Sequence, residues 1–80
     1  MKTHHLKTWP VYFTESKIGN KNFEIRKNDR DFHVGDILIL EEYDITSKKY
    51  TGNTLSVAVT YTTFFGCADG YIVMGVRERK

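Results

Sequence analysis

Residues 19–30 read Gly-Asn-Lys-Asn-Phe-Glu-Ile-Arg-Lys-Asn-Asp-Arg, and this stretch joins a turn, a short strand and a polar loop. Gly19 is a turn signal, and residues 22–27 alternate between polar and apolar types, as in a half-buried strand. The period of two places Phe23 and Ile25 on one face of the strand. We expect that face to enter the core.

The other face of this strand collects charged side chains. Glu24 and Arg26 share it by their parity, and Lys21 at the turn can bend toward it. Residues 27–30 then add Lys, Asn, Asp and Arg. Because a carboxylate among so many cations is paired, the remaining positive charge faces outward. This pattern indicates a site for an anion.

The composition is that of a small folded domain. The chain has 80 residues, of which 40% are hydrophobic and 14% aromatic, too apolar for intrinsic disorder. A domain of this size buries about 60–65% of the surface that its unfolded chain exposes. Its five Phe, five Tyr and one Trp therefore contribute much of a modest core. We expect one domain, residues 1–80.

Several features predict a cytoplasmic location. Cys67 is the single cysteine, which excludes an intramolecular disulfide and indicates a reducing compartment. The basic N-terminus is not followed by the apolar run of a signal peptide, and no stretch approaches the roughly 18 apolar residues of a membrane span. We expect no membrane partner.

Charge is distributed unevenly along the chain. Residues 1–30 hold seven Lys or Arg against three acids, whereas residues 31–80 hold five against seven. A basic half joined to a mildly acidic half suits one face to phosphates. Chance unevenness in a small protein is the alternative explanation.

The periodicity predicts one helix and about five strands. Pro10 is suited to the first turn of a helix and Gly19 to its end, so a helix is expected near residues 10–18 with Val11, Tyr12, Phe13 and Ile18 along one side. A loop is expected over residues 45–54. The strands are expected at residues 3–9, 22–27, 37–40, 55–62 and 71–76.

Short strands joined by hairpin-like loops predict an antiparallel arrangement. Closing such strands into a barrel removes vulnerable sheet edges. The expected fold class is therefore mainly β (α+β), a small β-barrel of about five strands with one short helix.

The sequence offers little support for a metal or a nucleophile. His4 and His5 are adjacent, so on a strand they point to opposite faces, and His33 is the third imidazole. No spacing matches a known metal-ligand set, and Cys67 has no partner motif. No glycine-rich phosphate loop is present. We expect neither a metal nor a cofactor.

The basic strand and loop are the strongest candidates for binding. Lys and Arg neutralise phosphates, and aromatic rings stack on bases. Alternatively, Glu24 and Arg26 form an ordinary ion pair and Asn28-Asp29 makes a tight turn, which is the interpretation we favour for that dipeptide. The predicted RNA- or ligand-binding residues are Lys7, Trp9, Tyr12, Lys21, Glu24, Arg26, Lys27, Asn28 and Arg30.

The pattern Gly19-x-Lys21-x-x-Glu24-x-Arg26, followed by Phe32-x-Val34-Gly35-Asp36 and an apolar strand, resembles the ASCH (activating signal cointegrator homology) domain. This family is a branch of the PUA-like β-barrels, and the resemblance spans nearly the whole chain. It is closest to a group of small single-domain members. It implies a cleft beside the helix, lined by Lys21, Glu24 and Arg26, and a role in binding RNA.

Some small ASCH proteins are amidohydrolases that remove the acetyl group from N4-acetylcytidine. The resemblance assigns their lysine to Lys21, but Glu24 occupies the position of their threonine. Gly75 stands where the carboxylate of their last strand would lie. Two of the three catalytic positions therefore differ, although Glu24 beside Lys21 retains the character of a general base.

Two functions of different classes follow. The first is a non-catalytic module that binds RNA or a nucleotide-like ligand in the cleft. The second is a hydrolase acting on a modified nucleoside, with Lys21 and Glu24 as its polar groups. A protein–protein adaptor is a third class with no positive feature in the sequence. The oligomeric state and the base specificity are not predicted.

Overall fold

The computed structural model describes residues 1–79. In chain order these residues form β1 (Thr3–Thr8), α1 (Pro10–Lys17), β2 (Phe23–Lys27), β3 (Ile37–Asp44), β4 (Lys49–Thr63) and β5 (Tyr71–Glu78). The prediction of five strands and one helix is confirmed for this part of the chain. β3, β4 and β5 are each longer than the sequence pattern predicted.

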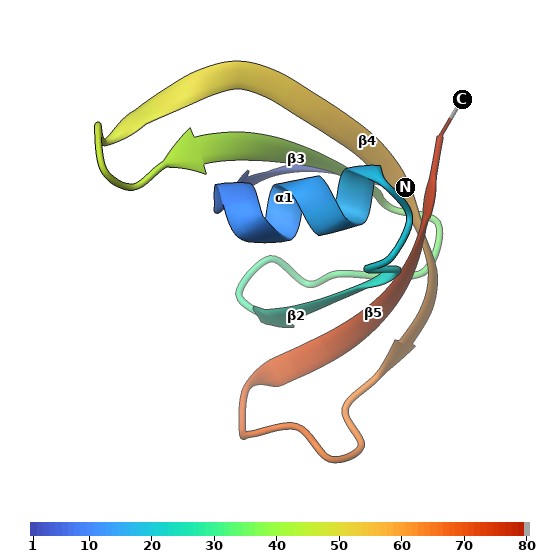
Figure 1. Cartoon of the computed structure of the whole chain (residues 1–80). Helices are drawn as coiled ribbons and strands as arrows, with labels where there is room; N and C mark the ends of the chain where they lie inside the picture. Colours follow the sequence, from blue (N-terminus) through green and yellow to red (C-terminus); the bar gives the residue numbers. More distant parts are fainter. Residues whose placement is uncertain (80) are drawn as a thin grey trace.

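The five strands form one sheet in the order β1-β3-β4-β5-β2. Figure 1 shows this sheet curving around α1 as a half-barrel, with β4 as a long arch that reaches both halves of the sheet. The mainly β, barrel-like class predicted from the sequence is confirmed. β1 and β2 are the two edges of the sheet.

The pairing of β1 with β3 differs from the sequence prediction because it is parallel. Thr3 lies opposite Ile37 at one end of this pair, and Thr8 lies opposite Glu42 at the other. Parallel strands need a long crossover connection, and α1 with β2 supplies one here. The pairs β3–β4, β4–β5 and β5–β2 are antiparallel, as expected.

The hydrophobic core fills the concave side of the sheet and reaches the inner face of α1. β-Bulges between Glu41 and Tyr43 and between Val59 and Tyr61 bend β3 and β4, because a bulge adds a residue to one strand and increases its twist. The strands can therefore curve around the core. The core residues are Leu6, Phe13, Phe32, Leu38, Leu40, Leu55, Val57, Val59, Ile72 and Met74.

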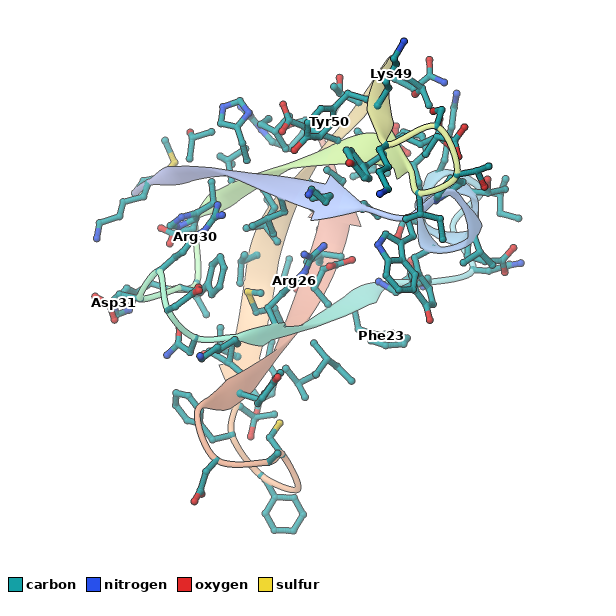
Figure 2. All side chains as sticks on the ribbon, turned by 90° about the vertical axis from the view of Figure 1, so that its left-hand side faces the viewer. Phe23, Arg26, Arg30, Asp31, Lys49 and Tyr50 are labelled. Atoms are coloured by element: carbon teal, nitrogen blue, oxygen red, sulfur yellow. The ribbon has the colours of Figure 1, made fainter. Side chains whose placement is uncertain are left out.

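β2 presents the opposite face to the core from the one that its pattern predicted. Phe23 is 45% exposed and Ile25 is 55% exposed, whereas Glu24 is only 2% exposed. Figure 2 shows Phe23 and Arg26 projecting from opposite sides of this strand. The prediction that Phe23 and Ile25 face the core is therefore wrong. The reverse orientation is stable because charged partners offset the cost of burying the Glu24 carboxylate, as described below.

The helix has its predicted boundaries but a different buried side. Pro10 occupies the first helical turn, and Gly19, just past the end, has a φ of +88° that favours glycine. Phe13 and Ser16 are buried, while the predicted apolar neighbours Val11, Tyr12 and Ile18 are exposed. No helix within residues 1–79 has both the length and the apolarity required to cross a membrane.

The hairpin between β3 and β4 is tighter than the loop predicted over residues 45–54. Residues 45–48 make the turn, and Asp44 already pairs with Lys49. The Asp44 carboxylate accepts hydrogen bonds from the Thr46 backbone N–H (3.0 Å) and the Ser47 hydroxyl (3.1 Å), which close the turn. These hydrogen bonds lower the pKa of the Asp44 carboxyl.

Asp36 ties together three segments at the other end of the sheet. Its buried carboxylate accepts from the Lys2 N–H (3.0 Å) and the His33 N–H (3.0 Å) and lies 2.9 Å from His4 Nε2. Burial alone would raise the pKa of this carboxyl, but the hydrogen bonds from His4, Lys2 and His33 outweigh it and lower the pKa to about 2. His4 is buried and His5 exposed, as their adjacency on a strand predicted.

Candidate functional site

A buried carboxylate with two cationic partners forms the centre of the site. Glu24 Oε2 lies 2.5 Å from Lys21 Nζ, and Glu24 Oε1 accepts from Arg26 Nε at 2.9 Å. Lys21 Nζ also donates to the Phe23 carbonyl at 2.8 Å. A carboxylate so deeply buried is stable only when it is paired and hydrogen-bonded. The triad Lys21–Glu24–Arg26 meets that condition.

Arg26 also connects the two edges of the sheet. Its Nη1 donates to the Lys7 carbonyl (3.1 Å) and its Nη2 to Thr8 Oγ1 (3.3 Å). Four residues further along the chain, Arg30 Nη1 donates to the His5 carbonyl at 2.6 Å. These carbonyls belong to the free edge of β1, where backbone groups need partners. Figure 2 shows Arg26 and Arg30 lying between β1 and the part of the chain that contains β2 and the loop after it.

These hydrogen bonds reduce the number of Arg26 and Arg30 donors that remain for binding an anion. Glu24 compensates the charge of Arg26, and backbone carbonyls occupy donors of Arg26 and Arg30. A guanidinium has five N–H donors, so each retains donors that these hydrogen bonds do not use. Lys21 likewise has three donors and uses two of them on Phe23 and Glu24.

A pocket of about 920 Å³ opens beside the triad. Its walls come from the end of β1, the start of α1, β2 and the first residue of β5. Trp9 and Tyr12 stack along one wall, with 6.2 Å between ring centroids and 23° between ring planes. The lining residues are Lys7, Thr8, Trp9, Tyr12, Lys21, Phe23, Glu24, Ile25, Arg26 and Tyr71.

Six of the nine residues predicted for binding line this pocket. They lie far apart in the sequence, and the fold brings them together because β1 leads directly into α1 while β2 returns below it. Lys7 Nζ additionally lies 4.2 Å from the centroid of the Tyr43 ring, which orients this cation. The six residues are Lys7, Trp9, Tyr12, Lys21, Glu24 and Arg26.

The other three predicted residues lie elsewhere. Lys27 and Arg30 line a separate, smaller pocket of about 190 Å³, which shares Arg26 with the first. Asn28 Oδ1 accepts from the Phe32 N–H at 3.0 Å. Asn28 therefore shapes the turn after β2, as the favoured interpretation of that dipeptide held.

Sequence reasoning missed four lining residues: Thr8, Phe23, Ile25 and Tyr71. Phe23 and Ile25 were assigned to the core by their apolarity. Tyr71 lies opposite Lys27 in the β2–β5 ladder, a pairing that no local pattern reveals. The parity of Thr8 with Leu6 on β1 was the one signal that would have placed its side chain on the inner face.

The geometry permits recognition of a planar polar ligand. Aromatic rings flank a floor of fixed charges, and the volume lies within the roughly 300–1,000 Å³ typical of small-molecule sites. Among residues 1–79, no three His, Cys, Asp or Glu side chains gather as a group able to hold a metal ion.

Comparison with protein families identifies one match over most of the chain. Residues 3–76 match the family model described as Domain of unknown function (DUF3850). Because the match spans nearly all of the 80 residues, the chain belongs to this family. Among curated proteins no match was found.

Proposed function

We propose that the protein is a non-catalytic binding module for RNA or a nucleotide-like ligand, acting in the cytoplasm. The observation that carries this proposal is the pocket in which aromatic rings surround the Lys21–Glu24–Arg26 triad. The resemblance to the ASCH domain implies the same function, and it remains a prediction from the sequence.

A nucleobase fits the chemistry of the pocket walls and floor. Stacking on Trp9 or Tyr12 tolerates any base, because every base has an aromatic face. Glu24 still has unused lone pairs and can accept a hydrogen bond from an exocyclic amino group, as acidic residues do for cytosine. The remaining donor of Lys21 and the ammonium of Lys7 belong to the same pocket and supply the positive charge that a phosphate requires.

The test is a binding panel of the four ribonucleoside monophosphates, measured by isothermal titration calorimetry, because Trp9 is the single tryptophan and its fluorescence is lost in Trp9→Ala. We expect binding that weakens when Trp9 or Tyr12 is replaced by Ala, by roughly 1–3 kcal/mol for a stacked base. The Glu24→Gln variant should change the preference among the four bases. Absence of binding to all four, with the protein folded by circular dichroism, contradicts the proposal.

A hydrolase acting on a modified nucleoside is the second candidate. The contact between Lys21 Nζ and Glu24 Oε2 favours it, because a lysine and a carboxylate held together in a pocket resemble a proton-transfer pair. Incubation with N4-acetylcytidine and related acylated nucleosides separates the two functions. Hydrolysis by the wild type that disappears in Glu24→Gln would establish the enzyme and overturn the binding module.

A further inference from the structure

The outward side of the sheet carries an aromatic surface that the proposed pocket does not account for. In the register, Phe23 and Tyr61 both lie opposite Gly75, from its two neighbouring strands, and Lys27 lies opposite Tyr71. Directly opposed residues share one face of a sheet. We call this surface the aromatic face and define it as Phe23, Ile25, Tyr61, Tyr71 and Val73.

The rings of the aromatic face are available to a partner. Tyr61 is 65% exposed and Tyr71 is 41% exposed, in addition to Phe23 and Ile25 described above. Gly75 lies between Phe23 and Tyr61 and places no side chain between their rings. A glycine within a strand marks a place where another group approaches the backbone closely. Here that group is the neighbouring strand, since a Cβ at Gly75 would lie 3.3 Å from Thr60 Oγ1 and 3.5 Å from Tyr61 Cβ. The exposed rings of Phe23 and Tyr61 on either side of Gly75 are therefore what a partner would contact.

The charge around the aromatic face favours a nucleic acid. Among the described outward positions of β2, β5 and the end of β4, the charged side chains are Lys27 and Arg77, both cationic. Lys21 Nζ also lies 5.0 Å from the centroid of the Phe23 ring. Two copies meeting through this face would bring like charges together, which disfavours association. Exposed rings beside cations match single-stranded nucleic acid, whose bases stack while its phosphates are neutralised.

The aromatic face is continuous with the pocket. Phe23, Ile25 and Tyr71 belong to the aromatic face and also line the pocket. We propose that the two form one track for single-stranded RNA, in which the pocket holds one nucleotide and the aromatic face stacks its neighbours. The pocket end of this track rests on the proposed function, whereas the aromatic face is an additional binding surface.

The variant Tyr61→Thr tests the aromatic face separately from the pocket. Threonine keeps the β-branched character that suits a strand and removes the ring, and Tyr61 does not belong to the lining of the pocket. Tyr50→Thr is the matched control, because Tyr50 is 55% exposed on the distant β3–β4 hairpin, as Figure 2 shows. Each protein is titrated with the four ribonucleoside monophosphates and with an eight-nucleotide single-stranded RNA of mixed sequence.

We expect Tyr61→Thr to weaken binding of the eight-nucleotide RNA by about five- to a hundredfold, the loss of one base stack. Its affinity for mononucleotides should equal that of the wild type, and Tyr50→Thr should change neither affinity. An unchanged affinity of Tyr61→Thr for the RNA overturns the track and leaves the pocket proposal standing. Conversely, RNA binding that depends on Tyr61 without any mononucleotide binding overturns the pocket and retains the aromatic face.

Two further measurements complete the test. A wild-type dimer that dissociates in Tyr61→Thr, measured by analytical ultracentrifugation, would assign the aromatic face to a second copy and overturn the track. If Tyr61→Thr does not fold, the double variant Lys27→Gln/Arg77→Gln replaces it. We then expect the dependence of log affinity on log salt to become shallower by roughly 0.7 for each lost phosphate contact, and an unchanged slope overturns the track.

Discussion

At the scale of single residues, Glu24 determines how β2 is oriented. Its carboxylate is buried between Lys21 and Arg26, whose side chains keep partial contact with solvent. An isolated carboxylate there would be driven outward by the loss of its hydration. The two cations remove that penalty, so the strand can expose Phe23 and Ile25 instead. The same three charges form the floor of the pocket, which links the fold of β2 directly to the proposed binding chemistry.

The variant Glu24→Gln should therefore reduce stability as well as alter ligand preference. Gln keeps the shape but loses the charge that both cations contact, and hydrogen bonds to charged groups contribute about 1.5–3 kcal/mol each. Because Lys21 and Arg26 can rehydrate, we expect the free energy of unfolding to fall by about 1–3 kcal/mol. Urea denaturation measures this loss. The exposed Glu15→Gln is the control, and equal midpoints for the two variants would contradict the assignment.

At the scale of secondary-structure elements, local patterns predicted most boundaries correctly. Pro10 and Gly19 delimit the helix, and the β-branched alternation of residues 55–62 identifies the second half of β4. These signals are local, so they need no knowledge of the rest of the molecule. The burial of Leu38 and Leu40 likewise follows from a continuous apolar run in a strand that lies between two others.

The errors at this scale have two different causes. The cations that pair with Glu24 are in the same short stretch, but no local pattern shows that Arg26 also reaches the Lys7 carbonyl and Thr8 on β1. The parallel pairing of β1 depends on the path of the chain through α1, which no short window of sequence contains. For the candidate site, the residues of the Gly19–Arg26 motif were found because their charges are conspicuous. The exposed apolar residues of the pocket are not found in the same way, because apolarity alone predicts burial.

The bridge between β1 and the β2 segment makes a prediction about local opening. Arg30→Met keeps the length of the side chain and removes the hydrogen bond to the His5 carbonyl. We expect the free energy of local opening at β1 to fall by about 1 kcal/mol. The effect should be confined to this edge strand, because β3, β4 and β5 each pair with a neighbouring strand on both sides. Hydrogen exchange should accelerate at the amides of β1 and not at those of β4.

Arg79→Met serves as the control for Arg30→Met, because it removes a cation from an exposed position at the end of the chain. Arg26→Met should have the larger effect, since Arg26 contacts Glu24, Lys7 and Thr8 together. Uniform acceleration of exchange across all five strands in Arg30→Met would mean that the arginine supports global stability and not this edge.

At the scale of the whole molecule, two polar anchors hold the half-barrel at opposite ends of β1. The Lys21–Glu24–Arg26 triad attaches β2 to the end of β1. Asp36 attaches the start of β1 to the segment that enters β3. Between these anchors the core residues of β1, β3, β4 and β5 supply apolar burial. Because a domain this small has a modest core, we expect each anchor to contribute a measurable share of its stability.

Asp36 predicts how stability depends on acid. The pKa of its carboxyl is about 2 in the folded protein, below its ordinary value of 3.8. Between these values the unfolded chain binds a proton that the folded protein does not, so stability rises with pH. The contribution is complete above about pH 4 and amounts to about 2 kcal/mol, and it is lost as pH falls toward 2. Other carboxylates add to this acid dependence, so a comparison of variants is required.

The comparison uses urea unfolding of the wild type, Asp36→Asn and Asp69→Asn at several values between pH 2 and pH 7. Asp36→Asn lacks the group whose pKa differs between the folded and unfolded states, so its stability should decline less steeply between pH 4 and pH 2. Asp69 lies exposed in the β4–β5 loop, and its replacement should leave the wild-type slope unchanged. If the wild type and Asp36→Asn lose stability in parallel across this range, the buried carboxylate does not contribute the predicted acid sensitivity. In that case the anchor at the start of β1 would depend on packing, including the contact between the His4 and Phe32 rings at 4.7 Å.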